Sequence, residues 1–297
     1  MERAGYDRAF AAGLTAYGGL LGPIIPPSIV FVVYAVLAQV AVRDMLLAGL
    51  VPGLMLTGLF VLTVAALGHW QRYPRGPRSC WADRGRAALA AAPMLTIPLV
   101  IVGTILGGFG SPTEAAAIGA LVAASIGLFH TRTLRLRDFP AILLRTGMNT
   151  ALVLFLVAAA GVFSWVLVFG MVPQTVAAWM EGVATTPLGF LLLVLVLLLL
   201  VGTVVDGIAG LIMVVPILLP IATGVYGIDP LHFGVVVSIT LILGLLTPPV
   251  GVGLYVAAST SGVEPLRVFA VALPFFLVAC AALVLLVLFP GLSLAFL

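Results

Sequence analysis

A double proline occurs twice in the chain, each time in the middle of a long apolar run. The first pair lies in residues 22–28 (Gly-Pro-Ile-Ile-Pro-Pro-Ser) and the second in residues 244–250 (Gly-Leu-Leu-Thr-Pro-Pro-Val). The same spacing of 222 residues aligns ten identical residues over about fifty positions, six of them Gly, Pro or Asp. Two copies of one motif at a constant spacing indicate an internal repeat.

Proline has no backbone N–H and its ring collides with the preceding turn, so a helix breaks where two prolines follow each other. A broken backbone inside a membrane survives only where protein or a water-filled cavity covers it. Matching breaks in two halves of a chain point to the binding site of a transporter. The alternative is a pair of kinks that serve packing alone.

The composition requires a membrane protein. Of all residues, 63% are hydrophobic and 8% are charged, whereas a soluble domain has about 25% charged residues. Runs such as residues 191–201 do not alternate as barrel strands do, which favours helices. All thirteen basic residues are Arg and gather in loops, so the net charge reflects membrane topology and we expect no nucleic-acid partner. Cys80 and Cys280 have no metal-ligand spacing, and no cofactor is expected.

The apolar runs divide the chain into two repeats with scaffold helices between them. Repeat one is predicted at 1–69 and is incomplete, with a broken helix at 9–41 and a helix at 46–68. An Arg-rich loop at 70–86 follows, and then scaffold helices and an interfacial arm at 87–186. Repeat two is predicted at 187–297, with a hairpin at 188–223, a broken helix at 231–260 and a last helix at 268–290.

The distribution of Arg predicts how these parts cross the membrane. Short Arg-rich loops stay in the cytoplasm, so we expect loops 70–86 and 131–138 on that side. Each arm of the hairpin at 188–223 has about fourteen residues, or roughly 20 Å of helix, less than the ~30 Å hydrocarbon core. The hairpin is therefore predicted to be re-entrant, with its tip at 202–207. The two repeats are then inverted, and twelve of the thirteen Arg residues lie on the cytoplasmic side, Arg43 being the exception.

Asp206 is the one acidic residue inside an apolar segment without a loop around it. Ionisable groups inside membrane segments are costly and mark functional sites. Its carboxylate, with nearby hydroxyl and backbone carbonyl oxygens, makes a site suited to Na⁺; alternatively, Asp206 caps the second arm of the hairpin. The candidate Na⁺-binding residues are Gly202, Thr203, Asp206, Gly207, Gly244 and Thr247.

Three other acidic residues are predicted to cap helices. Asp7 and Asp229 precede the two broken helices at equivalent positions, where Asp accepts hydrogen bonds from free backbone N–H groups. Residues 111–114 (Ser-Pro-Thr-Glu) have the pattern of a capping box in which Glu114 reaches back to the first N–H. An ion-binding role of Glu114 is the alternative. His232 is expected at the membrane interface.

Four strings of residues, in this order, resemble the large permease subunit of TRAP (tripartite ATP-independent periplasmic) transporters, and together they span nearly the whole chain. The strings are Gly-Tyr-Asp at 5–7 with Gly-Pro-Ile-Ile-Pro-Pro-Ser-Ile at 22–29, Ser-Pro-Thr-Glu-Ala-Ala-Ala at 111–117, Asp-Pro-Leu-His-Phe-Gly at 229–234, and Gly-Leu-Leu-Thr-Pro-Pro-Val-Gly at 244–251.

The resemblance implies an elevator-type ion-transporter architecture in the bacterial inner (cytoplasmic) membrane. It implies Na⁺-coupled import of organic acids such as C4-dicarboxylates, other carboxylates or sialic acid. It also implies two partners, a small four-helix membrane subunit and a periplasmic solute-binding protein. The family has a first hairpin upstream of the first broken helix, and this chain begins after that point, so repeat one is expected to lack it. Residues 204–205 (Val-Val) also depart from the family, which more often has an aromatic residue and a Met there.

The sequence therefore predicts an all-α integral membrane protein in the lipid bilayer, with inverted repeats, that transports a carboxylate and is not an enzyme. The substrate is predicted to dock on the half-helix N-termini at the breaks, while Na⁺ orders the hairpin. A divalent-anion symporter of related architecture and a truncated, non-transporting membrane scaffold are the alternatives. The candidate substrate-binding residues are Gly22, Pro26, Pro27, Ser28, Thr247, Pro248, Pro249 and Gly251.

Overall fold

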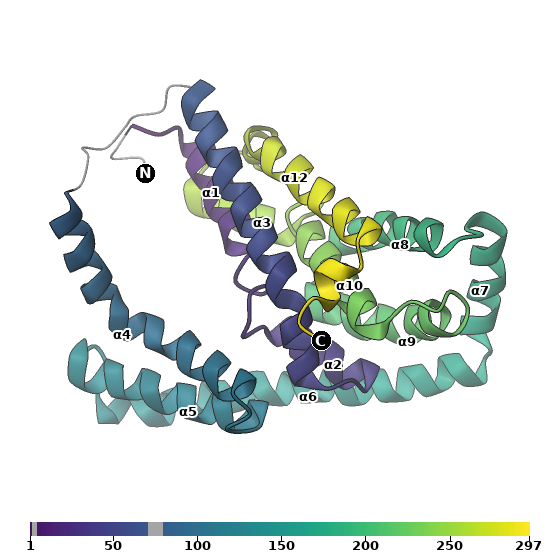
Figure 1. The fold of residues 1–297 in the computed structure, drawn as a ribbon, viewed down its shortest axis with the longest axis horizontal. Coiled ribbons are helices and arrows are strands. Elements are labelled where there is room, and N and C mark those ends of the chain that lie inside the picture. The colour runs from purple at the N-terminus through teal and green to yellow at the C-terminus, as the bar shows by residue number, and fades with distance from the viewer. Residues whose placement is uncertain (2–4, 71–79) are drawn as a thin grey trace. The chain divides into compact units, whose positions relative to one another are not determined.

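The computed structural model describes residues 1, 5–70 and 80–297, which form helices without a strand (Figure 1). Six of the described helices are long and apolar enough to cross a membrane. The predicted all-α integral membrane protein is thereby confirmed. By the contacts between its residues, the chain divides into two units, Met1–Pro74 with Ala159–Leu297, and Arg75–Ala158.

The first unit contains both broken helices and the hairpin. Its helices are α1 (Arg8–Gly19), α2 (Ile29–Ala38), α3 (Val42–Trp70), α7 (Val172–Val183), α8 (Pro187–Gly202), α9 (Gly207–Gly224), α10 (Pro230–Gly244), α11 (Val252–Ser261), α12 (Pro265–Leu288) and α13 (Gly291–Leu294). The second unit contains α4 (Trp81–Leu106), α5 (Pro112–Ser125), the π-helical turn η2 (Ile126–His130), the 3-10 turn η3 (Leu136–Asp138) and the first part of α6 (Phe139–Phe169), which continues into the first unit.

The same succession of elements occurs twice in the first unit. Helices α1, α2 and α3 follow one another as α10, α11 and α12 do. Asp7 and Asp229 cap the first helix of each set, and each carboxylate accepts two backbone N–H groups at 2.8 to 3.2 Å. The third helix of each set contains a proline, Pro52 or Pro274. Both predicted caps are confirmed, and the inverted orientation of the repeats stays a prediction.

Two helices begin four or more residues earlier than the sequence predicts. Helix α3 begins at Val42 rather than at 46, because Asp44 in its first turn faces the positive end of the helix dipole. Helix α4 begins at Trp81, so the end of the predicted loop 70–86 is helical. There Asp83 also lies in a first turn, and the guanidinium of Arg84 lies 5.2 Å from the centre of the Trp81 ring. Residues 71–79 of that loop lie outside the described residues.

The hairpin consists of α8 and α9, joined by residues 203–206. Its arms have 16 and 18 residues, longer than predicted, and they rise about 24 and about 27 Å at 1.5 Å per residue. Helix α9 is long and apolar enough to be a membrane span, whereas α8 is among the shorter apolar helices. The re-entrant path of the hairpin stays a prediction.

Helix α10 forms the core of the first unit. Every residue from His232 to Gly244 is buried, and the helix packs against α2, α3, α8, α9, α12 and α13. Figure 1 shows α8, α9 and α10 in the same part of the ribbon. A helix that is apolar on all sides either lies in a protein core or faces lipid, and the contacts of α10 place it in the core. The second break directly follows α10, so its position is fixed by a helix of the core.

Candidate functional site

The tip of the hairpin is hydrogen-bonded to the second break. The backbone N–H of Gly251 donates to the carbonyl oxygen of Thr203 at 2.7 Å. Gly251 has a φ of 43°, in the left-handed region that glycine adopts most readily. This bond brings a predicted Na⁺-binding residue, Thr203, beside a predicted substrate-binding residue, Gly251.

Two glycines bring the backbones of α8 and α10 into contact next to this bond. A Cβ added to Gly244 would lie 2.6 Å from the Cα of Gly202. One added to Gly202 would lie 2.8 Å from the carbonyl oxygen of Leu241. Only glycine permits such a close approach of two backbones. Four of the predicted residues, Gly202, Thr203, Gly244 and Gly251, therefore gather at one place.

Asp206 caps α9 at the hairpin tip. Its Oδ2 accepts a hydrogen bond from the backbone N–H of Ile208 at 3.2 Å, and the side chain is exposed. Oδ1 accepts no hydrogen bond from any residue that the structure describes. The next residue, Gly207, is buried and faces α10, where an added Cβ would lie 3.9 Å from Ile242. The capping role of Asp206 is confirmed, and one of its oxygens remains for a further partner.

The two threonines of the predicted Na⁺ set direct their hydroxyl hydrogens into their own helices. Thr203 donates to the carbonyl oxygen of Leu200 at 2.7 Å, and Thr247 donates to that of Leu243 at 3.0 Å. A hydroxyl that has given its hydrogen still offers lone pairs. In each case the oxygen is therefore oriented as an acceptor, which is the role that a cation ligand needs.

The predicted substrate residues of the first break are held by local contacts. The Ser28 hydroxyl donates to a backbone carbonyl five residues earlier and accepts the N–H of Phe31 at 3.2 Å, which caps α2. Pro26 and Ser28 are buried, whereas Gly22 and Pro27 are exposed. Within the described residues, no hydrogen bond joins this break to the hairpin tip. In both breaks the peptide bond between the two prolines is cis.

In the second break, the prolines lie between the ordered ends of two helices. Pro248 is half-buried and Pro249 is exposed. On either side of them, the backbone N–H of Thr247 donates to Gly244 at 2.9 Å and that of Gly253 donates back to Leu245 at 3.0 Å. The break is thus a folded loop, and its carbonyl and N–H groups lie at fixed positions.

A cavity of about 880 Å³ lies between α1, α11 and the two breaks. The first break contributes Pro23 to its wall, and the second contributes Leu245 and Leu246. The polar side chains of the lining are those of Arg8, Thr15, Thr260 and Ser261. None of the predicted substrate-binding residues lines this cavity. Its walls come instead from residues a few positions away and from α11, which the sequence pattern did not single out.

The first turns of α10 connect three other elements. The hydroxyl of Tyr34 in α2 donates to the carbonyl oxygen of Pro230 at 2.5 Å, and its ring covers Gly234, where an added Cβ would come within 2.2 Å. Nδ1 of His232 lies 3.1 Å from the hydroxyl of Ser293 in α13. His232 is buried, and its expected place at the membrane interface stays a prediction. The motif at 229–234 therefore contacts α2 of repeat one through Pro230 and Gly234, and α13 through His232.

Glu114 forms the predicted capping box of α5. Its Oε2 accepts the backbone N–H of Ser111 at 2.6 Å, and the Ser111 hydroxyl accepts the N–H of Glu114 at 3.3 Å. Among the described residues, no group of three or more His, Cys, Asp or Glu side chains gathers as a metal site would require. The predicted Na⁺ set uses hydroxyl and carbonyl oxygens with a single carboxylate.

Comparison with known proteins agrees with the resemblance. The sequence matches the family described as "Tripartite ATP-independent periplasmic transporter, DctM component" over residues 1–292. It is 36% identical, over 295 residues, to the C4-dicarboxylate TRAP transporter large permease protein of Pseudomonas aeruginosa, covering 99% of this chain and 69% of the relative.

Two further relatives are named for other substrates. The isethionate TRAP transporter permease protein of Oleidesulfovibrio alaskensis is 36% identical over 301 residues, covering 100% of this chain and 47% of the relative. The sialic acid TRAP transporter large permease protein of Vibrio cholerae is 36% identical over 277 residues, covering 90% and 65%. The chain thus spans between about half and about two thirds of the length of these relatives.

The family match covers nearly the whole chain, and it includes both breaks, the hairpin and the motif at 229–234. A multi-pass helical membrane protein with these features is a membrane subunit of a TRAP transporter. The chain belongs to the DctM family, the large permease component of tripartite ATP-independent periplasmic transporters.

Proposed function

We propose that the chain is the large transmembrane subunit of a Na⁺-coupled TRAP-type secondary transporter in the bacterial inner membrane. It takes up an organic acid, such as a C4-dicarboxylate, another carboxylate or sialic acid. The substrate is delivered by a periplasmic solute-binding protein, and a small four-helix membrane subunit completes the complex. The Arg-rich loops 70–86 and 131–138 face the cytoplasm.

The observation that supports Na⁺ coupling is the hydrogen bond between Gly251 and Thr203. It holds the hairpin tip against the second break, so that a carboxylate, two threonine oxygens and the carbonyls at the end of α10 belong to one region. Hard oxygen ligands of this kind suit Na⁺, and carbonyls at unwound helix ends are the usual source in transporters. Binding of Na⁺ there orders the hairpin tip against α10.

The half-helices support recognition of an anion. Helices α2 and α11 both begin at a break, and the first N–H groups of a helix carry partial positive charge. A carboxylate placed at a break would therefore meet the positive end of a half-helix, as in other transporters with discontinuous helices. Arg8 adds a cationic side chain to the wall of the cavity between the breaks. The volume of the cavity is within the usual range for small-molecule sites, about 300–1,000 Å³.

The experiment is uptake into proteoliposomes that contain the full native complex, with the binding protein added outside. Uptake of labelled succinate, sialic acid and isethionate is measured with an inward Na⁺ gradient and with choline in place of Na⁺. We expect uptake of at least one substrate that requires both Na⁺ and the binding protein. Uptake without the binding protein would favour a divalent-anion symporter instead. Binding of both partners without uptake of any organic acid would favour a non-transporting scaffold.

A further inference from the structure

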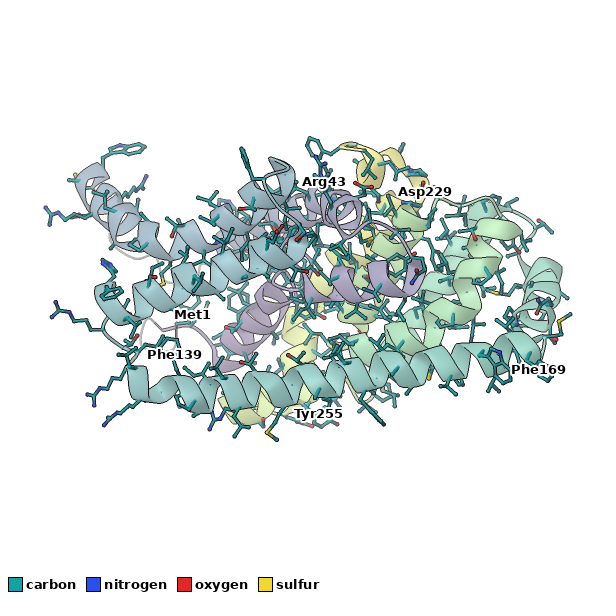
Figure 2. All side chains as sticks on the ribbon, turned by 90° about the horizontal axis from the view of Figure 1, so that it is seen from below. Met1, Arg43, Phe139, Phe169, Asp229 and Tyr255 are labelled. Atoms are coloured by element: carbon teal, nitrogen blue, oxygen red, sulfur yellow. The ribbon has the colours of Figure 1, made fainter. Side chains whose placement is uncertain are left out.

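The segment between η2 and α6 carries an unusual concentration of cationic side chains. We define the arginine segment as residues 129–145, which lie wholly within the second unit. It contains one acidic residue, Asp138, and four exposed arginines: Arg132, Arg135, Arg137 and Arg145. Across residues 1, 5–70 and 80–297, none of these four guanidinium groups forms an ion pair. Around the labelled Phe139, nitrogen-tipped side chains project away from the ribbon in Figure 2.

The arginine segment is folded, so these charges are presented at fixed places. The N–H of Leu134 donates to the carbonyl oxygen of Gly127 at 3.1 Å. The Leu134 side chain lies against Gly127 so closely that an added Cβ would come within 2.3 Å of it. Asp138 accepts the backbone N–H of Arg135 at 2.9 Å. The single carboxylate of the segment therefore holds the backbone and does not neutralise a guanidinium group.

Large apolar side chains lie among the arginines and are equally exposed. Phe129 is 77% exposed and Leu136 is 78% exposed. At the start of α6, Leu143 and Leu144 are 66% and 67% exposed. A surface that alternates free cations with free apolar groups is costly in water, but it matches the boundary between lipid headgroups and acyl chains. There the apolar groups are buried in lipid and the long cationic side chains reach the headgroups.

We propose that the arginine segment binds an anionic phospholipid, with guanidinium groups on its phosphate and Phe129 and Leu136 against its acyl chains. Arginine suits this role because its planar fork can bond two phosphate oxygens at once. A cluster of four or more basic residues at the end of a membrane helix is the pattern of anionic lipid recognition. The site stands on the second unit alone, so it is independent of Na⁺ coupling and of the transported substrate.

The test compares lipid binding by the full chain, purified in detergent, with that of two variants. The first is the triple variant R132Q/R135Q/R137Q. The second, R43Q/R84Q/R86Q, loses the same charge elsewhere and serves as the control. Native mass spectrometry counts bound phosphatidylglycerol and phosphatidylcholine, and titration of each lipid gives an apparent affinity. Soluble glycerophosphate, which has the phosphate without acyl chains, is titrated in parallel.

We expect the unmodified chain to bind phosphatidylglycerol more tightly than phosphatidylcholine. The triple variant should bind phosphatidylglycerol at least about tenfold more weakly, while the control variant changes by less than about threefold. Raising NaCl from about 0.1 M to about 0.5 M should weaken binding to the unmodified chain, because surface charges are screened. Glycerophosphate should not compete. Equal affinity of the two lipids, an unchanged triple variant, or full competition by glycerophosphate would overturn the proposal.

Discussion

The backbone N–H of Gly251 donates to the carbonyl oxygen of Thr203 at 2.7 Å, and this bond joins the hairpin tip to the second helix break. Thr203 follows the last residue of α8, and Gly251 precedes the first residue of α11. The contact is possible because Gly202 and Gly244 let the backbones of α8 and α10 come close together. Under the proposed function, this bond links the Na⁺ site at the hairpin tip to the break.

Asp206→Asn tests the proposed Na⁺ site in the complete transporter. Asparagine still caps α9, whereas the negative charge is lost. We expect the Na⁺ concentration for half-maximal uptake to rise about tenfold, which corresponds to about 1.4 kcal/mol of lost binding free energy. The matched control is Asp229→Asn, which keeps the cap of α10 and should leave Na⁺ dependence as it is. Unchanged Na⁺ dependence in Asp206→Asn would remove this residue from the site.

Gly244→Ala tests the backbone contact between the hairpin and α10. The new Cβ would meet the Cα of Gly202 at 2.6 Å, and backbone atoms cannot turn away as a side chain can. We expect a loss of about 1–3 kcal/mol in the free energy of unfolding, measured as a lower midpoint of thermal unfolding in detergent. Gly58→Ala is the control, because Gly58 is exposed in α3 with open space around it. That change should be neutral or stabilise by up to about 1 kcal/mol.

Tyr34→Phe tests the link between repeat one and α10. The ring remains over Gly234, and only the hydrogen bond to Pro230 is lost. We expect a loss of about 0.5–1.5 kcal/mol in stability, whereas Tyr34→Ala also removes the packing and should cost about 3–5 kcal/mol. Tyr255→Phe, at an exposed position, should change stability by less than about 0.5 kcal/mol. An equal effect of the two Tyr→Phe changes would speak against the link.

Glu114→Ala distinguishes a helix cap from an ion ligand. The carboxylate accepts hydrogen bonds from Ser111 and closes the capping box of α5, so alanine should lower the midpoint of thermal unfolding. Glutamine can still accept from the same N–H, and Glu114→Gln should retain most of the stability. Because we assign Glu114 no contact with Na⁺, uptake by both variants should keep its Na⁺ dependence. A raised Na⁺ requirement in Glu114→Gln would show that the charge itself is needed.

Features that depend on a few neighbouring residues could be predicted from the sequence. Asp7 and Asp229 cap helices because a carboxylate just before a helix meets the free N–H groups two and three residues later. The breaks at the double prolines follow from the missing N–H and the ring clash, whatever surrounds them. The apolar composition likewise settles that the chain is a helical membrane protein, because lipid leaves the backbone no other partner than its own helix.

The tertiary structure alone decided which distant residues meet. Tyr34 and Pro230 are 196 positions apart and His232 and Ser293 are 61 apart, and no local pattern marks them as partners. The residues that line the cavity also depend on tertiary packing, because α1 and α11 come together only when the two repeats assemble. The sequence determined where helices start, break and end, through interactions within one or two turns. The three-dimensional fold decided the contacts between helices, because these depend on the shapes of side chains that are far apart in the chain.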